Sequence, residues 1–352
     1  MTVFPHRARR GGTALACLTA VALGAGACGS ADSEQAGNDG ALKIVATTNV
    51  WADVARAVGG PGVEVESIID DPAADPHSYE SSPRDAAKVS DADLVVLNGG
   101  GYDEFAEQIL AGSGSEKPTV QAVEGGHEHG HDHGAPEQEG AAEEHEHGTE
   151  EHGADEHEHE HGTEAHGADE HAGHDHSGNE HVWYDLHVVR ETADRIAAEL
   201  GELRPEQAQS FRDGAARFGE QIEGLEGRVQ EISATEHGRE VIVTEPVAHY
   251  LVEAAGLTDI TPPSFVHSVE SGNDPSAAAV AEIQNAVQSR RAAAVIYNPQ
   301  TESPVTESVR EAAEQNRTPV VEMTETLPPG VDYVRWMDGQ ISALRDALPA
   351  QP

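Results

Sequence analysis

The sequence predicts an α/β protein with two lobes, each built on a parallel-type sheet, that are joined by one long rigid helix. Three patterns support this class. Short apolar runs alternate with amphipathic helical segments over residues 42–110, the same alternation returns over residues 240–348, and a regular apolar stripe lies between the two regions. Alternating strands and helices are typical of parallel sheets covered by helices. A chain of 352 residues has room for two such lobes and for additional segments.

The N-terminal segment is predicted to be a targeting signal. Basic residues begin it, and residues 13–25 form an apolar run that is too short to remain in a membrane as a spanning helix. The run leads into Ala25-Gly26-Ala27-Cys28, which resembles a bacterial lipobox, although Ala25 replaces the usual leucine. We therefore expect lipidation of Cys28 and a protein anchored by lipid to the cell membrane, outside the cytoplasm. Ordinary secretion with cleavage near Ala27 is the alternative.

Composition limits the kinds of ligand that the chain can bind. The formal net charge is −43, which excludes nucleic acid as a partner because phosphate binding needs clustered Lys and Arg. The acidic balance instead favours the attraction of cations. Cys17 lies inside the signal and Cys28 is the expected lipid anchor, so any metal ligands of the mature chain must be His, Asp or Glu.

The first lobe is predicted to alternate strands and helices. We expect strands at 42–46, 63–69 and 94–97, and helices at 51–58, from Ser82-Pro83 onward and at about 102–110. Ser82 is a favourable N-cap, and Pro83 suits the first turn because its missing N–H is not needed there. His77 comes just past the second strand, at the carboxyl edge where α/β sheets bind ligands. Taken alone, a loop histidine is more often a solvated side chain than a ligand.

A histidine- and acid-rich segment follows the first lobe. We expect it to be an auxiliary metal-binding loop with His127, His129, His131, His133, His145, His147, His157, His159 and His161. Residues 145–157 recur at 159–171 with one difference, Glu151 against Ala165. The segment has almost nothing apolar to bury, so we expect it to be disordered. It would hold zinc, copper or nickel at several weak sites and lose them below roughly pH 6, as imidazoles protonate. A low-complexity insertion without a role is the alternative.

Two helices are predicted to connect this segment to the second lobe. Asp185 can cap a helix that ends near Gly201. Over residues 205–233, apolar residues repeat at alternating four- and three-residue spacing. This stripe predicts a helix roughly 40 Å long at 1.5 Å per residue, which could span two lobes. A coiled-coil partner could explain the same stripe, but the flanking α/β segments favour packing within the chain.

The second lobe repeats the α/β pattern. We expect strands at 240–244, 292–297 and 319–321, and helices from about 246 to 256 and at 275–290, 304–316 and 331–348. Glu245 and Glu325 both follow strands, at the edge that would face the first lobe. A glutamate at such a position is more often a helix cap or a surface group than a ligand. His249 lies one helical turn after Glu245 and is a candidate ligand, a hydrogen-bond partner or a surface residue.

These motifs together resemble a known family. The segments 75–80 (Asp-Pro-His-Ser-Tyr-Glu), 181–185 (His-Val-Trp-Tyr-Asp), 244–245 (Thr-Glu) and 324–326 (Thr-Glu-Thr) resemble, in order, the zinc/manganese-type (cluster A-I) substrate-binding lipoproteins of ABC transporters, in their zinc-uptake branch. The resemblance covers about residues 42–348 without the histidine-rich segment. The first motif matches fully. After the second motif, Leu186 stands where the family usually has Pro, and His187 follows it.

The resemblance implies a metal site in the cleft between the lobes, with His77, His181, Glu245 and Glu325 as ligands. A glutamate at the third position is typical of manganese binders, whereas a histidine-rich insertion before the second ligand is typical of zinc binders. Two imidazoles and two carboxylates can hold Zn²⁺ tetrahedrally, and Mn²⁺ prefers more oxygen ligands. If His249 replaced Glu245, three imidazoles with one carboxylate would favour zinc.

We divide the chain into a signal peptide (1–28), a flexible tether (29–41), an N-terminal α/β lobe (42–123), the histidine-rich loop (124–180), a ligand-bearing segment with its helix (181–204), a linking helix (205–235) and a C-terminal α/β lobe (236–352). We expect a monomeric, non-enzymatic receptor that delivers Zn²⁺ to the permease subunits of an ABC importer. A metallochaperone is a further candidate partner, and Mn²⁺ is the alternative ion.

Two functions of other classes stay open from the sequence. One is a zinc-dependent hydrolase that uses Glu245 or Glu325 as its base, although neither lobe contains the His-Glu-x-x-His pattern of such enzymes. The other is an extracellular metal buffer or adhesin whose functional part is the histidine-rich loop.

Overall fold

Two four-stranded parallel sheets form the framework of the protein, which confirms the predicted fold class. The computed structural model describes residues 40–72, 74, 76–114, 116–123 and 178–348. The first sheet has the order β2-β1-β3-β4, with β1 (Leu42–Thr48), β2 (Val63–Ile69), β3 (Leu94–Gly99) and β4 (Thr119–Val123). The second has the order β6-β5-β7-β8, with β5 (Glu240–Val243), β6 (Thr258–Asp259), β7 (Ala294–Tyr297) and β8 (Val320–Glu322).

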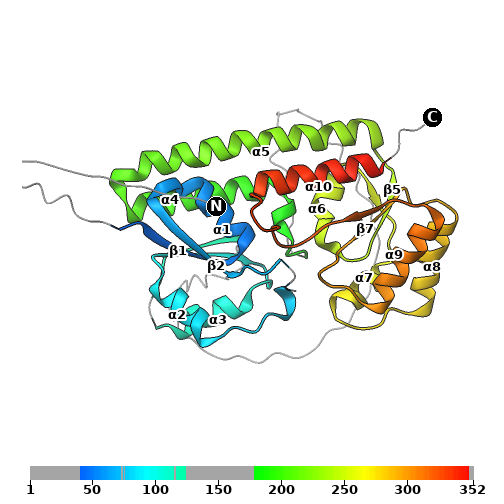
Figure 1. Ribbon diagram of the computed structural model, residues 1–352, viewed down its shortest axis with the longest axis horizontal. Coiled ribbons are helices and arrows are strands. Elements are labelled where there is room, and N and C mark those ends of the chain that lie inside the picture. The colour runs from blue at the N-terminus through cyan, green and yellow to red at the C-terminus, as the bar shows by residue number, and fades with distance from the viewer. Residues whose placement is uncertain (1–39, 73, 75, 115, 124–177, 349–352) are drawn as a thin grey trace, which may run out of the picture. The chain divides into compact units, whose positions relative to one another are not determined.

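Helices surround both sheets (Figure 1). They are α1 (Asn49–Gly59), α2 (Pro83–Asp91), α3 (Glu104–Gly112), α4 (Leu186–Leu203), α5 (Ala208–Glu236), α6 (His249–Ala254), α7 (Pro263–Glu270), α8 (Ala277–Gln288), α9 (Pro304–Asn316) and α10 (Tyr333–Ala347). Five short 3₁₀ turns join them, namely η1 (Gly60–Gly62), η2 (Pro76–Ser78), η3 (Val182–Tyr184), η4 (Pro205–Gln207) and η5 (Pro246–Ala248).

The predicted helix starts are confirmed by their hydrogen bonds. Ser82 and Asp85 form a reciprocal capping box at the start of α2. The Asp185 carboxylate accepts from the backbone N–H groups of His187 and Val188 at the start of α4. That helix continues two residues beyond Gly201, where we expected its end, because packing against α5 outweighs the weak helix propensity of glycine.

Three elements were not expected from the sequence. β4 is an edge strand with alternating burial, and its five residues directly precede the histidine-rich segment. β6 has only two residues, both exposed. α7 buries one side chain, Phe265, so its apolar pattern is too sparse to predict a helix.

The long helix α5 ties the two halves of the chain together. Its apolar stripe is buried at Phe211, Ala215, Phe218, Ile222, Leu225, Val229 and Ile232. Its 29 residues span about 43 Å. The helix contacts α1 and α4 beside the first sheet and α6 and α10 beside the second (Figure 1). One hydrophobic core therefore runs through both lobes and includes Trp51, Ile222 and Met337.

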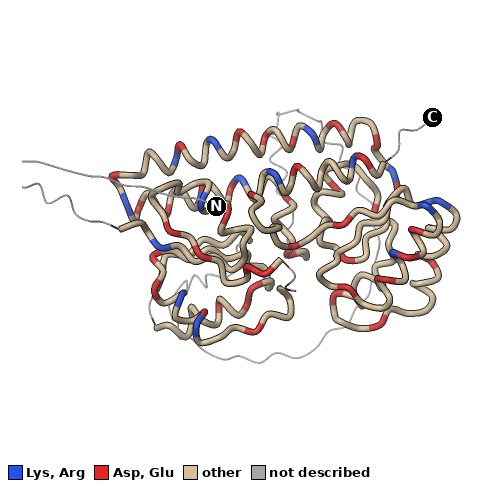
Figure 2. The backbone as a smooth tube through the Cα atoms, in the orientation of Figure 1, with Lys and Arg blue, Asp and Glu red and all other residues tan. Residues whose placement is uncertain are grey.

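Several sequence predictions lie outside the described residues. They are the signal peptide, the lipidation residue Cys28, most of the tether, and the loop histidines from His127 to His161. Among the described helices, none combines the length and the apolar character needed to cross a lipid bilayer. Lys and Arg are scattered between Asp and Glu along both lobes (Figure 2).

Gly214 provides a test of how closely α5 packs. A Cβ atom at this position would lie 2.1 Å from the Val58 carbonyl oxygen of α1. Because backbone cannot move aside cheaply, we expect Gly214→Ala to lower the free energy of unfolding by about 1–3 kcal/mol in a denaturant titration. Gly224→Ala on the same helix is the matched control, since its Cβ would meet nothing within 4 Å. The control should be neutral or stabilising by up to about 1 kcal/mol, and equal stability of the two variants would contradict this packing.

Candidate metal centre

The ends of four structural segments place the predicted site residues. His77 lies in η2, a few residues beyond β2, and His181 immediately precedes η3. Glu245 comes two residues after β5, and Glu325 comes three residues after β8. Since the carboxyl ends of parallel strands form one edge of each sheet, these residues can meet where the two edges face each other.

Three of the four side chains come together. His77, His181 and Glu325 each offer a ligand atom, and these atoms lie within 4.8 Å of one another. The Nε2 atoms of the two histidines are 3.4 Å apart, and His77 Nε2 lies 3.3 Å from Glu325 Oε2. These two separations suit a shared cation at bond lengths of about 2.0–2.2 Å. The cluster contains residues from both lobes, so it could form only where the lobes approach.

Burial divides the two histidines into different electrostatic environments. His181 is 1% exposed, and burial lowers its pKa to about 4, so its ring is neutral at pH 7. The His77 side chain is 33% exposed. Its partial burial opposes charge, but the hydrogen bond and charge of Glu325, with the charges of Glu180 and Glu245, raise its pKa to about 9. His77 therefore carries a proton at neutral pH in the metal-free protein.

Glu325 is the anion that His77 balances. Its side chain is fully buried, and burial alone would raise its pKa. The hydrogen bond with His77 and the nearby histidines outweigh burial, so the pKa is lowered. Tyr102 donates its hydroxyl to Oε2 at 2.8 Å, and Asn298 donates its amide to Oε1 at 2.8 Å. Both carboxylate oxygens thus have fixed partners.

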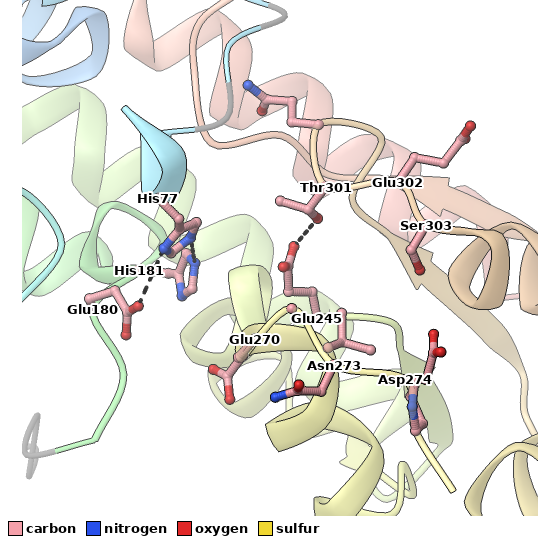
Figure 3. A pocket seen from close by; sticks show the side chains of 14 residues that line it. His77, Glu180, His181, Glu245, Glu270, Asn273, Asp274, Thr301, Glu302 and Ser303 are labelled. Atoms are coloured by element: carbon pink, nitrogen blue, oxygen red, sulfur yellow. Dashed lines mark hydrogen bonds and ion pairs between the residues drawn. The ribbon is translucent and has the colours of Figure 1, made fainter. Parts of the chain in front are cut away.

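Glu245 lies in the same pocket but outside the three-residue cluster (Figure 3). Its Oε2 accepts from Asn298 Nδ2 at 2.6 Å and from the Thr301 hydroxyl. Burial and the charge of Glu325 raise the pKa of Glu245 to about 7 against these hydrogen bonds. The amide of Asn298 therefore bridges the two glutamates and reduces the repulsion between them.

His249 is not brought to the cluster. Its side chain is 50% exposed and lies 3.8 Å from Glu253 on α6. The expectation that His249 lies one helical turn after Glu245 is wrong, because Glu245 has the extended backbone angles φ −157° and ψ 149° and α6 begins only at His249. His187, the unexpected histidine after the second motif, is also exposed and pairs with Glu191 on α4.

The cluster opens into a cavity of about 330 Å³. In Figure 3, His77, His181 and Glu180 lie on one wall, and Glu245 with Thr301 lies on the opposite wall. Carboxylates at Glu270, Asp274 and Glu302 also line the cavity. Such a lining attracts cations and repels anions.

Tyr102 and Asn298, which hold the candidate ligand Glu325 in place, were not predicted from the sequence. Tyr102 follows a turn in which Gly99, Gly100 and Gly101 all have positive φ, which other residues adopt only with strain. This turn carries Tyr102 toward Glu325. Asn298 directly follows β7 at the carboxyl edge, so its position after a strand was the signal available in the sequence.

Known proteins share the two-lobed part of this chain. The model of the family described as "Zinc-uptake complex component A periplasmic" matches residues 44–347. A crystal structure of ZnuA superposes with a TM-score of 0.63 and 19% identity, covering 88% of this chain and 100% of that chain, which shows the shared fold.

Two curated relatives carry the names of different metals. The manganese-binding lipoprotein MntA of Bacillus subtilis is 25% identical over 199 residues, which cover 56% of this chain and 52% of MntA. The zinc-binding lipoprotein AdcA of Streptococcus pneumoniae is 23% identical over 327 residues, which cover 89% of this chain and 57% of AdcA. The matched segments thus span little more than half of either relative.

Asn298 provides a test of the glutamate pair. We expect Asn298→Ala to destabilise the metal-free protein by about 1–3 kcal/mol, because two buried carboxylates lose a donor. The measurement is the free energy of unfolding in denaturant. Asn273→Ala, at an exposed position on the same cavity, is the control and should change stability by less than about 0.5 kcal/mol. If both variants were equally stable, the bridge would have no energetic role.

Proposed function

The chain belongs to the family of zinc-uptake complex component A, and from this premise we propose that it is an extracytoplasmic receptor that binds Zn²⁺ and delivers it to an ABC-type metal importer. One observation carries the proposal. The imidazoles of His77 and His181 and the buried carboxylate of Glu325, which comes from the second lobe, offer ligand atoms that lie within 4.8 Å of one another. The proposed ligands are His77, His181 and Glu325, with Glu245 as the fourth.

The donors around the carboxylates support zinc over manganese. The two oxygens of Glu325 are held by Asn298 and Tyr102, and Glu245 Oε2 is held by Asn298 and Thr301. These bonds favour coordination through one oxygen of each carboxylate. Zinc is commonly four-coordinate with such ligands, whereas Mn²⁺ favours more oxygen ligands. The histidine-rich loop, which precedes His181 in the sequence, supports the same choice.

Location and partners are proposed from the sequence and the relatives together. The lipobox-like sequence before Cys28 agrees with the names of MntA and AdcA, which are both called lipoproteins. We therefore propose a lipid-anchored receptor whose partners are the membrane subunits of an ABC permease. A receptor needs to hold its ion and release it unchanged, so no catalytic base is assigned to Glu245 or Glu325.

The loop-deleted protein is the decisive material for testing the site. A protein that lacks residues 126–178 should still bind one zinc ion tightly, because the proposed ligands all lie outside that segment. We expect His77→Ala and His181→Ala to weaken zinc binding at least about 100-fold in competition calorimetry, since each removes a direct ligand. His249→Ala is the matched control and should bind as the unmodified protein does. If tight stoichiometric binding disappeared with the loop, the protein would instead be an extracellular metal buffer whose functional part is the histidine-rich loop.

The choice of ion is tested in the same titrations. We expect zinc to displace manganese from the loop-deleted protein, because two imidazoles favour zinc. The protein would be assigned to manganese uptake if it bound manganese in preference to zinc and if Glu245→Ala abolished manganese binding.

Proton release provides a test that does not depend on substitutions. Zinc must bind the free lone pair of His77, whose raised pKa of about 9 keeps the ring protonated at pH 8. Binding at pH 8 should therefore release about one proton per ion, and the apparent association constant should rise up to about tenfold per pH unit below pH 9. Calorimetry in buffers of different ionisation enthalpy measures this number. Binding with no proton release would contradict the combination of a protonated His77 and its role as a ligand.

A further inference from the structure

The side chain of Asn179 lies between His181 and the second lobe. Its Oδ1 atom is 2.8 Å from the backbone nitrogen of His181 and 2.8 Å from Nδ1 of the same residue. Its Nδ2 atom donates to the carbonyl oxygen of Pro246 at 2.9 Å. One amide group thus contacts a predicted metal ligand on one side and the residue after Glu245 on the other.

The orientation of this amide follows from partners whose roles are fixed. The backbone N–H of His181 can only donate, so the atom facing it must be the amide oxygen. The carbonyl of Pro246 can only accept, so the atom facing it must be the amide nitrogen. A rotated amide would place donor against donor at His181 and acceptor against acceptor at Pro246. The two contacts therefore agree on a single orientation.

This orientation decides which nitrogen of His181 carries the proton. Because Asn179 Oδ1 is an acceptor, Nδ1 of a neutral His181 ring must be the donor. The proton then lies on Nδ1, and Nε2 keeps its lone pair. Nε2 is the atom that faces His77 Nε2 across 3.4 Å. The ring is set for metal binding before an ion arrives.

Two further hydrogen bonds hold the backbone beside Asn179. Tyr250 of α6 donates its hydroxyl to the Asn179 carbonyl at 2.7 Å. From the first lobe, Asn98 Nδ2 donates to the carbonyl of Glu180 at 2.8 Å. Residues 179–181 are therefore held by both lobes, and the second lobe contributes to the position of a first-lobe ligand.

We propose that Asn179 is a positioning residue, which holds His181 in the tautomer with its proton on Nδ1 and couples the orientation of that ring to the second lobe. The proposal rests on the proposed function, in which His181 is a metal ligand. Outer partners of this kind fix the tautomer and orientation of ligating histidines, and their loss typically weakens metal binding about 10–100-fold.

The tautomer is measured on the full-length, metal-free protein. Histidine-labelled protein gives ring ¹⁵N signals that distinguish a proton on Nδ1 from a proton on Nε2, and His181→Ala identifies the signal. We expect the Nδ1–H form in the unmodified protein and in Asn179→Asp, which keeps an acceptor oxygen. Asn179→Ala should shift the ring toward the Nε2–H form. A wild-type ring with its proton on Nε2 would overturn the proposal, whether or not the variants fold.

The consequence for binding is measured with a chelator that keeps free zinc too low to fill weak sites. Asn179→Ala should weaken zinc binding about 10–100-fold, and Asn179→Asp should recover most of that loss. Tyr250→Phe, which removes a second-lobe contact but leaves the Asn179 side chain, should keep the tautomer unchanged.

Equal affinity of Asn179→Ala and the unmodified protein would overturn the positioning role. Undiminished zinc binding by His181→Ala would instead overturn the proposed function. The tautomer measurement would remain valid, because it is made on the metal-free protein.

Discussion

The buried carboxylate of Glu325 is the constraint on which the site depends. A charged group without exposure is strongly unfavourable unless it has a countercharge and hydrogen-bond donors. Glu325 obtains both from across the molecule, since His77 and Tyr102 come from the first lobe and Asn298 comes from the second. Separation of the lobes would remove two of these three partners. The same contacts that stabilise the anion therefore gather the candidate ligands.

The hydrophobic framework explains why these contacts form at one place. α5 and α10 lie along both lobes, and α10 also contacts α1 of the first lobe (Figure 1). Tyr333 of α10 donates its hydroxyl to the Trp183 carbonyl at 2.7 Å and its backbone N–H to the Asp53 carboxylate. Since Trp183 follows His181 by two residues, the shared core positions the second histidine as well as joining the lobes.

Neutral groups surround the candidate ligands and set their orientation. Asn298, Tyr102 and Asn179 carry no charge at neutral pH, yet they decide which oxygen or nitrogen lone pairs face the centre of the cluster. This arrangement separates two tasks. In the proposed receptor, the histidines and glutamates would provide affinity for a cation, and the neutral donors and acceptors would limit how each of them could coordinate.

The sequence by itself determined the fold class, the long linking helix and most element positions, because these depend on local apolar periodicity and on caps such as Ser82 and Asp185. It also indicated His77, Glu245 and Glu325 as candidates because each follows a strand, and the family resemblance implied His181 as a further ligand. Only the tertiary structure separated His249 from the cluster and revealed Asn298, Tyr102 and Asn179 beside it. The exclusion of His249 depends on the backbone angles at Glu245. The contacts of Asn298 and Tyr102 with the glutamates, and those of Asn179 with Pro246, join residues tens to hundreds of positions apart, which no local pattern contains.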